Sequence, residues 1–277
     1  ATRRKQKGVQ AYAGELVQAV ADRMGWAMNE LGDRVIPSAG LDDEGHLDLP
    51  CGPDEKLYRA TLSEDLTFVL KNPDGKVIKS LPAGDDDGTK ASKKQFTASK
   101  KELKQVVTMQ SSRLYEALCA GRSWSLEAWQ RDFFDHPVMR RMIERVVWQG
   151  LDADGQPLGT FRPTAEGEFT DAEDNDVDPG TFSALRVAHG AMLDEETANL
   201  WAQHMKDYEV TPLFTQFGRS LMRLEKGKQD ETEITDRAGW TMETFQLRGI
   251  ATKRGWERGP AEDGGWFHAY RRPFTSA

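Results

Sequence analysis

Residues 58–78 read YRATLSEDLTFVLKNPDGKVI, and this stretch decides the fold class. Apolar residues alternate with polar ones in two short runs, at 58–62 and at 66–70. Alternation with a period of two is typical of half-buried β-strands. The tetrapeptide NPDG at 72–75 is a turn, because proline fixes φ and glycine supplies a positive φ, so the chain returns as a further short strand. With a similar alternation at 47–49, we predict a small antiparallel meander.

Long helices are predicted on both sides of this meander. From Tyr12 to Val35 the apolar residues recur at spacings of three and four, which places them on one helical face. A second helix from Lys90 to Ala120 carries its own apolar stripe, and Gly121 closes it. The stripes consist of Leu16, Val20, Met24, Met28 and Leu31 in the first helix, and of Phe96, Leu103, Val107, Leu114 and Leu118 in the second.

The remaining segments mix helices and strands. We expect a helix capped by Ser123 or Ser125 and ended by His136-Pro137, a helix over 138–147, and a hairpin turn at 152–155. Further on we expect a short strand at 185–189, a helix from Asp194 to Tyr208, an extended stretch at 214–224, a helix within 234–249 that contains Trp240, Phe245 and Leu247, and a final strand at 266–270. Segregated elements with antiparallel turns predict an α+β fold, with small antiparallel β meanders packed against several amphipathic helices. We expect the apolar residues of these elements, from Tyr12 to Tyr270, to pack into one shared core.

Composition bounds the class of protein. A chain of 277 residues with eight tryptophans can bury a sizeable core. We expect a flexible basic tail at 1–11 and one α+β domain at 12–277, with a possible division into two subdomains near 84–89, where the polar stretch GDDDG lies. The chain lacks an initiator methionine, and we expect it to be a fragment of a larger multidomain protein. No apolar run approaches the ~20 residues that span a bilayer, so no membrane partner is expected.

Charge and cysteine content narrow the setting. The net charge of −8 argues mildly against broad binding to nucleic acids, which usually requires a basic face. Cys51 and Cys119 are too few for a disulfide framework and lack a CxxC spacing, so reduced thiols in a cytoplasmic protein are expected. The five histidines are scattered, and we expect neither a metal nor a cofactor.

Several segments in a fixed order carry a family resemblance. They are DRVIPSAGLDDEGHLDL (33–49), KSLP (79–82), GRSWSLEAWQRDFFDHPVMRRMIERVVWQG (121–150), DGQPLGTFRPTAEGEFTD (154–171), LDEETANLWAQHMKDYEVTPLFTQFGR (193–219), RGWERG (254–259) and DGGWFHAYRR (263–272). In this order they resemble the C-terminal region of the bacterial domain of unknown function 4132 family. The resemblance implies a cytoplasmic, multidomain protein. Some relatives carry a WGR domain or are described as regulators of molybdate metabolism, but no residue here gives a rationale for molybdate binding. The family usually has a histidine-proline pair where this chain has His189-Gly190.

Two groups of residues are candidate binding sites. Arg140 and Arg141, with Arg145, could bind an anion, because the arginine fork matches phosphate and carboxylate. The alternative is that they pair with Asp132, Asp135 and Glu144, which are close in sequence. Near the C-terminus, arginines beside aromatic rings form a common recognition surface, and the alternative is a structural turn with a buried tryptophan. The candidate residues there are Arg254, Trp256, Arg258 and His268.

Two further patterns have a plain structural alternative. The Lys90–Lys104 stretch holds six lysines against Glu102, so it could contact phosphates or form the solvated side of an amphipathic helix. Asp174, Asp176 and Asp178 have the spacing of a calcium loop, but Pro179 stands where the loop glycine belongs.

The sequence contains no GxSxG, Walker-type GxxxxGK[ST], HExxH or GxGxxG motif, so catalytic residues are not identified. The leading hypothesis is a cytoplasmic interaction or regulatory module that binds a protein partner or other domains of its parent chain. A nucleic-acid-associated module that uses the Lys90–Lys104 helix is one alternative. An enzyme of unrecognised type, whose site assembles from distant residues, is another.

Overall fold

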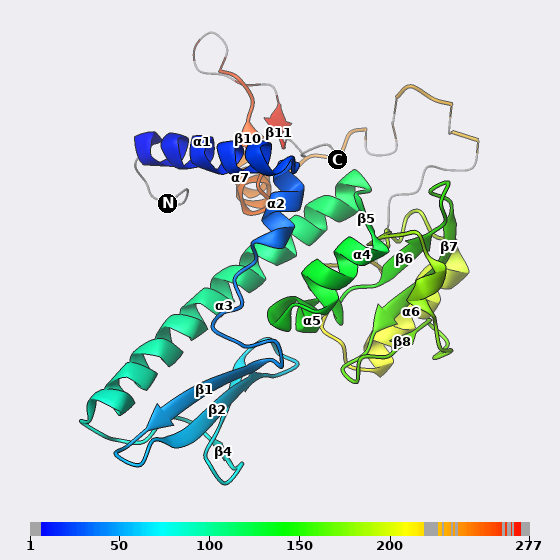
Figure 1. Cartoon of the computed structure of the whole chain (residues 1–277). Coiled ribbons are helices and arrows are strands. Elements are labelled where there is room, and N and C mark those ends of the chain that lie inside the picture. Colours follow the sequence, from blue (N-terminus) through cyan, green and yellow to red (C-terminus); the bar gives the residue numbers. More distant parts are fainter. Residues whose placement is uncertain are drawn as a thin grey trace. The chain divides into compact units, whose positions relative to one another are not determined.

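A computed structural model describes residues 7–218, 227–228, 230–233, 235, 238–261, 264, 267 and 269–272. The chain forms two compact units, one up to residue 219 and one from 220 to 276 (Figure 1). This boundary lies far from residues 84–89, where the sequence suggested a division. Within the described residues, the structure has no helix that combines the length and the apolar character needed to cross a membrane.

The first unit begins with two helices, α1 (Lys7–Met24) and α2 (Met28–Arg34). The sequence predicted one helix from Tyr12 to Val35, but Gly25 adopts a positive φ of 68° and interrupts it. A positive φ suits glycine and cannot continue a right-handed helix. Helix α1 also starts at Lys7, so residues 7–11 are helical, whereas the sequence predicted a flexible tail there.

The predicted meander is present and is fully antiparallel. Strands β1 (His46–Cys51), β2 (Lys56–Leu62), β3 (Phe68–Lys71) and β4 (Val77–Ile78) lie in the order β1-β2-β3-β4. Leu49 faces Tyr58, and Ala60 faces Leu70, so the alternating apolar residues meet across the strands. The NPDG turn forms as predicted, with Gly75 at a φ of 79° and its N–H donating to the carbonyl of Asn72.

Helix α3 (Asp87–Ala120) links the meander to the rest of the first unit (Figure 1). Asp86 caps it by accepting the backbone N–H of Thr89, and Gly121 ends it in the left-handed region at a φ of 65°. These caps satisfy backbone groups that the helix itself leaves unpaired. The predicted stripe is largely buried, with Phe96, Leu103 and Leu114 in the core.

A five-stranded antiparallel sheet follows, in the order β5-β9-β6-β7-β8. Ser125 caps α4, and a π-helix follows α4 directly. The helix predicted over 138–147 is shorter than expected, because α5 ends at Ile143. Helix α6 packs against β7, where Trp201 Nε1 donates to Thr160 Oγ1 at 2.7 Å. The bounds are β5 (Ser123–Ser125), α4 (Leu126–Trp129), π-helix η1 (Gln130–Phe134), α5 (Pro137–Ile143), β6 (Trp148–Leu151), β7 (Pro157–Pro163), β8 (Phe169–Thr170), 3-10 helix η2 (Pro179–Thr181), β9 (Ala184–Val187) and α6 (Glu195–Asp207).

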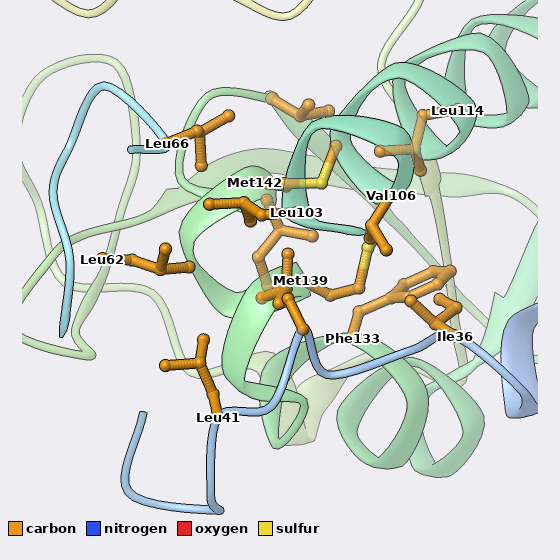
Figure 2. Packing of buried hydrophobic residues seen from close by; sticks show 14 of the residues in the cluster. Ile36, Leu41, Leu62, Leu66, Leu103, Val106, Leu114, Phe133, Met139 and Met142 are labelled. Atoms are coloured by element: carbon orange, nitrogen blue, oxygen red, sulfur yellow. The ribbon is translucent and has the colours of Figure 1, made fainter. Parts of the chain in front are cut away.

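One hydrophobic core joins the meander, α3 and the five-stranded sheet. Leu62 and Leu66 from the meander point toward Leu103 of α3 and toward Met139 and Met142 of α5 (Figure 2). Aromatic rings extend this core under the second sheet, where Trp124, Trp129, Trp148, Phe133 and Phe161 pack edge to face or tilted. A single core on both sides of residues 84–89 explains why no boundary falls there.

The second unit is small. It contains α7 (Thr244–Lys253) and a two-stranded antiparallel pair, β10 (Glu257–Arg258) with β11 (Tyr270–Arg271). The predicted helix is present but shifted. Trp240 lies before it and is 72% exposed, and Phe245 is also exposed, so neither forms the expected interior. Residues 214–218 form no strand, and 219–224 lie outside the described residues.

His136 stabilises the start of α5 and should make stability depend on pH. Its Nδ1 accepts the backbone N–H groups of Val138 and Met139, and its Nε2 lies 3.0 Å from the carbonyl oxygen of Ile36. This pattern requires a neutral ring with the proton on Nε2. Burial lowers the pKa of His136 from its ordinary 6.5, whereas the bond to Ile36 opposes that shift.

We therefore expect a loss of stability in mild acid. The folded state binds fewer protons than the unfolded chain below pH 6.5, so the free energy of unfolding is at its full value above 6.5. It should fall as the pH drops from 6.5 toward the folded pKa and level off below it. Urea denaturation at about pH 7.5 and about pH 5.5 measures this loss. His204 titrates with the same sign, so His136→Asn, which keeps a capping oxygen but does not titrate, isolates the effect. An equal loss in wild type and variant would contradict the assignment.

Candidate functional site

The arginine cluster predicted after His136 is divided among separate partners. Arg140 Nε donates to the carbonyl of Phe134 at 3.0 Å, and Arg141 contacts both carboxylate oxygens of Glu144 at 3.0 and 3.2 Å. Arg145 donates to the carbonyl of Glu64, a residue of the β2–β3 turn. The structural alternative therefore holds for Arg141, whereas Asp132 pairs with Arg131. A ligand at Arg140 and Arg141 stays a prediction.

The predicted aromatic–arginine surface lies in the second unit. Trp256 is 41% exposed, so the alternative of a buried tryptophan is wrong. The guanidinium of Arg258 lies 5.0 Å from the ring centroid of Phe267. The carbonyl of Arg254 accepts from Arg272 at 2.7 Å. His268 and Trp266 lie outside the described residues, so a groove here stays a prediction.

A polar pocket forms in the first unit from residues that are distant in sequence. It has a volume of about 260 Å³. Its charged lining comes from the β2–β3 turn, the end of α5, β7 and the segment after α6. Glu144, Arg145, Arg162, Glu166 and Tyr208 are among the lining residues.

The buried groups of this pocket are perturbed but already paired. Burial raises the pKa of Glu144, with Arg141 and Arg162 opposing, and burial lowers the pKa of Arg162, with Glu144 opposing. Arg162 donates to the carbonyls of Glu144 and Pro163 at 3.1 and 3.2 Å, and it lies 3.4 Å from His204 Nε2. His204 is buried, and its Nδ1 lies 3.6 Å from Asp174. His204 is therefore a core histidine whose two ring nitrogens face Arg162 and Asp174.

The size and pairing of the pocket argue against a small-molecule site. Ligand pockets usually measure roughly 300–1,000 Å³, and this one is smaller. Perturbed pKa values also arise in structural ion-pair networks. Both carboxylate oxygens of Glu144 are already in contact with Arg141. The arrangement therefore serves first to hold β7, α5 and α6 together.

The acidic segments show no convergent calcium loop. Asp174 faces His204, whereas Asp178 caps η2 by accepting the N–H of Gly180 at 2.8 Å. Within the described residues, one cluster of three possible metal ligands forms, from Asp42, Glu44 and His46, whose ligand atoms lie within 4.8 Å of one another. Asp42 Oδ1 accepts the backbone N–H groups of Glu44 and His46, so this carboxylate already serves the turn before β1.

Helix α1 presents the largest departure from the expected burial. The sequence predicted that its apolar stripe would face the core, but six large apolar side chains are between 36% and 64% exposed. We call these residues the apolar face of α1: Val9, Tyr12, Leu16, Val17, Val20 and Met24. They occupy one side of the helix because their spacings of three and four return to the same face.

Comparisons with known proteins agree with the resemblance seen in the sequence. Residues 75–256 match the family model described as domain of unknown function (DUF4132). The chain is 32% identical over 264 residues to the uncharacterized protein YehI of Escherichia coli (strain K12). The aligned region covers 93% of this chain and 22% of that relative, so the chain spans about a fifth of its length. No solved structure matches the chain. The chain thus belongs to the DUF4132 family, a domain of unknown function.

Proposed function

We propose that this chain is a cytoplasmic interaction module of a longer bacterial polypeptide, and that another domain of that polypeptide docks on the apolar face of α1. The observation that carries the proposal is the exposure of that face. Both cysteines are unpaired, as is usual in a reducing compartment, which supports the cytoplasmic setting.

The energetics of a surface helix favour a partner for α1. Most helical stability in proteins comes from packing an amphipathic face, because isolated helices of about this length are marginal in water. Scattered apolar side chains on a surface are ordinary, but a contiguous apolar strip usually marks an interaction site. In this 18-residue helix Ala13 and Ala21 are buried, but six large apolar side chains stay at least 36% exposed, so α1 lacks much of the contact that would stabilise it.

The chemistry of this face and the length of the relative support a partner from the same polypeptide. Apart from Arg23 near its C-terminal end, this side of α1 carries no charged residue, so it suits a protein surface better than a phosphate backbone. Because the chain aligns with only 22% of YehI, most of that relative consists of other sequence that could supply the partner domain. This supports an intramolecular contact between domains.

Leu16→Glu combined with Val20→Glu should abolish this contact. Each side chain contributes about 1.5–3 kcal/mol when fully buried, so the pair should weaken docking at least about 100-fold. Isothermal titration of the chain with the separately expressed remainder of its polypeptide measures the affinity. The unfolding free energy of the chain alone should change by less than about 1 kcal/mol, because both side chains are half-exposed.

A matched control places the same charges on the other side of α1. Ala11→Glu combined with Gln18→Glu should leave the affinity within about twofold of wild type. If Leu16→Glu/Val20→Glu binds as tightly as wild type, the apolar face of α1 is not the docking surface.

A further inference from the structure

A second cavity in the first unit differs from the polar pocket in size and in chemistry. It measures about 540 Å³, which lies within the usual range of ligand sites. The β2–β3 turn, α3 and the segment 212–213 form its walls. We call it the α3 groove, and its lining residues are Asp65, Leu66, Thr67, Phe68, Lys100, Leu103, Lys104, Val107, Thr108, Ser111, Arg145, Pro212 and Leu213.

The apolar part of the α3 groove is continuous with the core. Phe68 and Val107 are partly buried and pack against core residues, as does Leu213. Phe68 meets Phe96 edge to face at 5.7 Å between ring centroids. These side chains give the groove a fixed apolar lining that could accept a hydrocarbon chain.

Two lysines at the groove lack an acidic partner. Lys100 and Lys104 are four residues apart on α3, so their side chains lie on one face and can reach the same group. Lys100 Nζ lies 4.6 Å from the ring centroid of Phe96. In the part of the chain that the structure describes, neither ammonium group lies within 4.0 Å of a carboxylate.

The third cation at the groove is already neutralised. Arg145 donates to the carbonyl of Glu64 and lies 3.7 Å from Asp65, which is the single carboxylate in the lining. The excess charge of the groove therefore comes from Lys100 and Lys104. Two uncompensated cations beside an apolar cavity stand out in a chain with a net charge of −8.

We propose that the α3 groove binds an alkyl carboxylate, with the hydrocarbon chain along Phe68, Val107 and Leu213 and the carboxylate between Lys100 and Lys104. An apolar lining with one cationic patch complements a ligand that has one apolar tail and one anionic head. This inference does not depend on docking at α1, because no residue of α1 lines the groove.

Titration calorimetry with octanoate, decanoate and dodecanoate, below their micelle concentrations, tests the proposal. Each added methylene should tighten the Kd by roughly threefold to fourfold, so the series should improve by about tenfold at each step of two carbons. Lys100→Gln combined with Lys104→Gln should weaken decanoate binding by about tenfold or more. Both lysines are exposed, so the variant should fold normally.

The control is Lys90→Gln combined with Lys94→Gln, a pair with the same spacing on the same helix but outside the groove. Its Kd for decanoate should equal that of wild type. Three results would overturn the proposal: no binding of dodecanoate, an equal loss of affinity in both double variants, or decyltrimethylammonium binding as tightly as decanoate. Leu16→Glu/Val20→Glu should bind decanoate normally, which separates this site from the apolar face of α1.

Discussion

Asp33→Asn should destabilise the first unit by about 3 kcal/mol, because Asp33 neutralises two arginines at one point. Its carboxylate is 4% exposed and accepts from Arg113, from Arg122 and, at 2.8 Å, from Trp124 Nε1. Asparagine keeps the shape but removes the charge, and its amide N–H groups would face the N–H groups of an arginine. This contact ties α2 to α3 and β5, so its loss should be felt by the whole core. Urea denaturation followed by far-ultraviolet circular dichroism gives the change in unfolding free energy.

A surface ion pair serves as the control for Asp33. Arg59 donates two hydrogen bonds to Asp48, at 2.7 and 3.1 Å, but both side chains are more than 40% exposed. Exposed pairs of this kind contribute little to stability. Asp48→Asn should therefore cause only a small fraction of the loss seen with Asp33→Asn. Comparable losses in the two variants would show that Asp33 has no special structural role.

Trp148→Ala should cost about 3–5 kcal/mol, the range expected when a large buried aromatic side chain is removed. Trp148 on β6 is fully buried, and its ring lies 5.4 Å from Trp129 and 5.7 Å from Trp124. The cavity would open where the five-stranded sheet meets α4 and η1. Trp148→Phe should cost much less, because among the described residues the buried Nε1 of Trp148 has no hydrogen-bond partner.

An exposed tryptophan serves as the control, because its removal changes the same residue type without removing a packed side chain. Trp240→Ala removes a side chain that is 72% exposed, and the expected change is within about 0.5 kcal/mol. Thermal and urea unfolding of the three variants beside wild type measure the difference. If Trp148→Ala is as stable as Trp240→Ala, the aromatic cluster under the second sheet does not hold the core together.

Local patterns predicted the elements of this fold well. Alternation at 58–62 and 66–70, the NPDG turn and the stripe of α3 each depend on neighbours in sequence, and each is found in the structure. The α+β class is confirmed for the same reason. The break at Gly25 was also visible as a glycine, but the apolar period continued through it and favoured a single helix.

The pattern of α1 shows what periodicity cannot predict. Its spacing identified an apolar face correctly, but a period says nothing about what covers that face. The expectation that the face lies in the core was wrong for Leu16 and Val20, which are half-exposed. In the same way, lysine spacing on α3 indicated an exposed basic side but not that Lys100 and Lys104 border an apolar groove.

Contacts between distant residues were also beyond sequence reasoning. Arg162 meets His204 across 42 positions, and Asp33 meets Trp124 across 91. No local motif marks such pairs, because their partners are set by how the elements pack. A charged residue inside an apolar strand, such as Arg162 after Phe161, was the single available signal.

Hydroxyl-radical footprinting of α1 tests the central claim most directly. Met24 on the apolar face of α1 is 50% exposed, and Met192, which precedes α6, is 72% exposed and serves as an internal reference. We predict that Met24 oxidises several-fold more slowly in the full-length polypeptide than in this chain alone, while the oxidation rate of Met192 stays the same. Equal oxidation of Met24 in both proteins would contradict the account, because the apolar face of α1 would then be open to water in the full-length polypeptide as well.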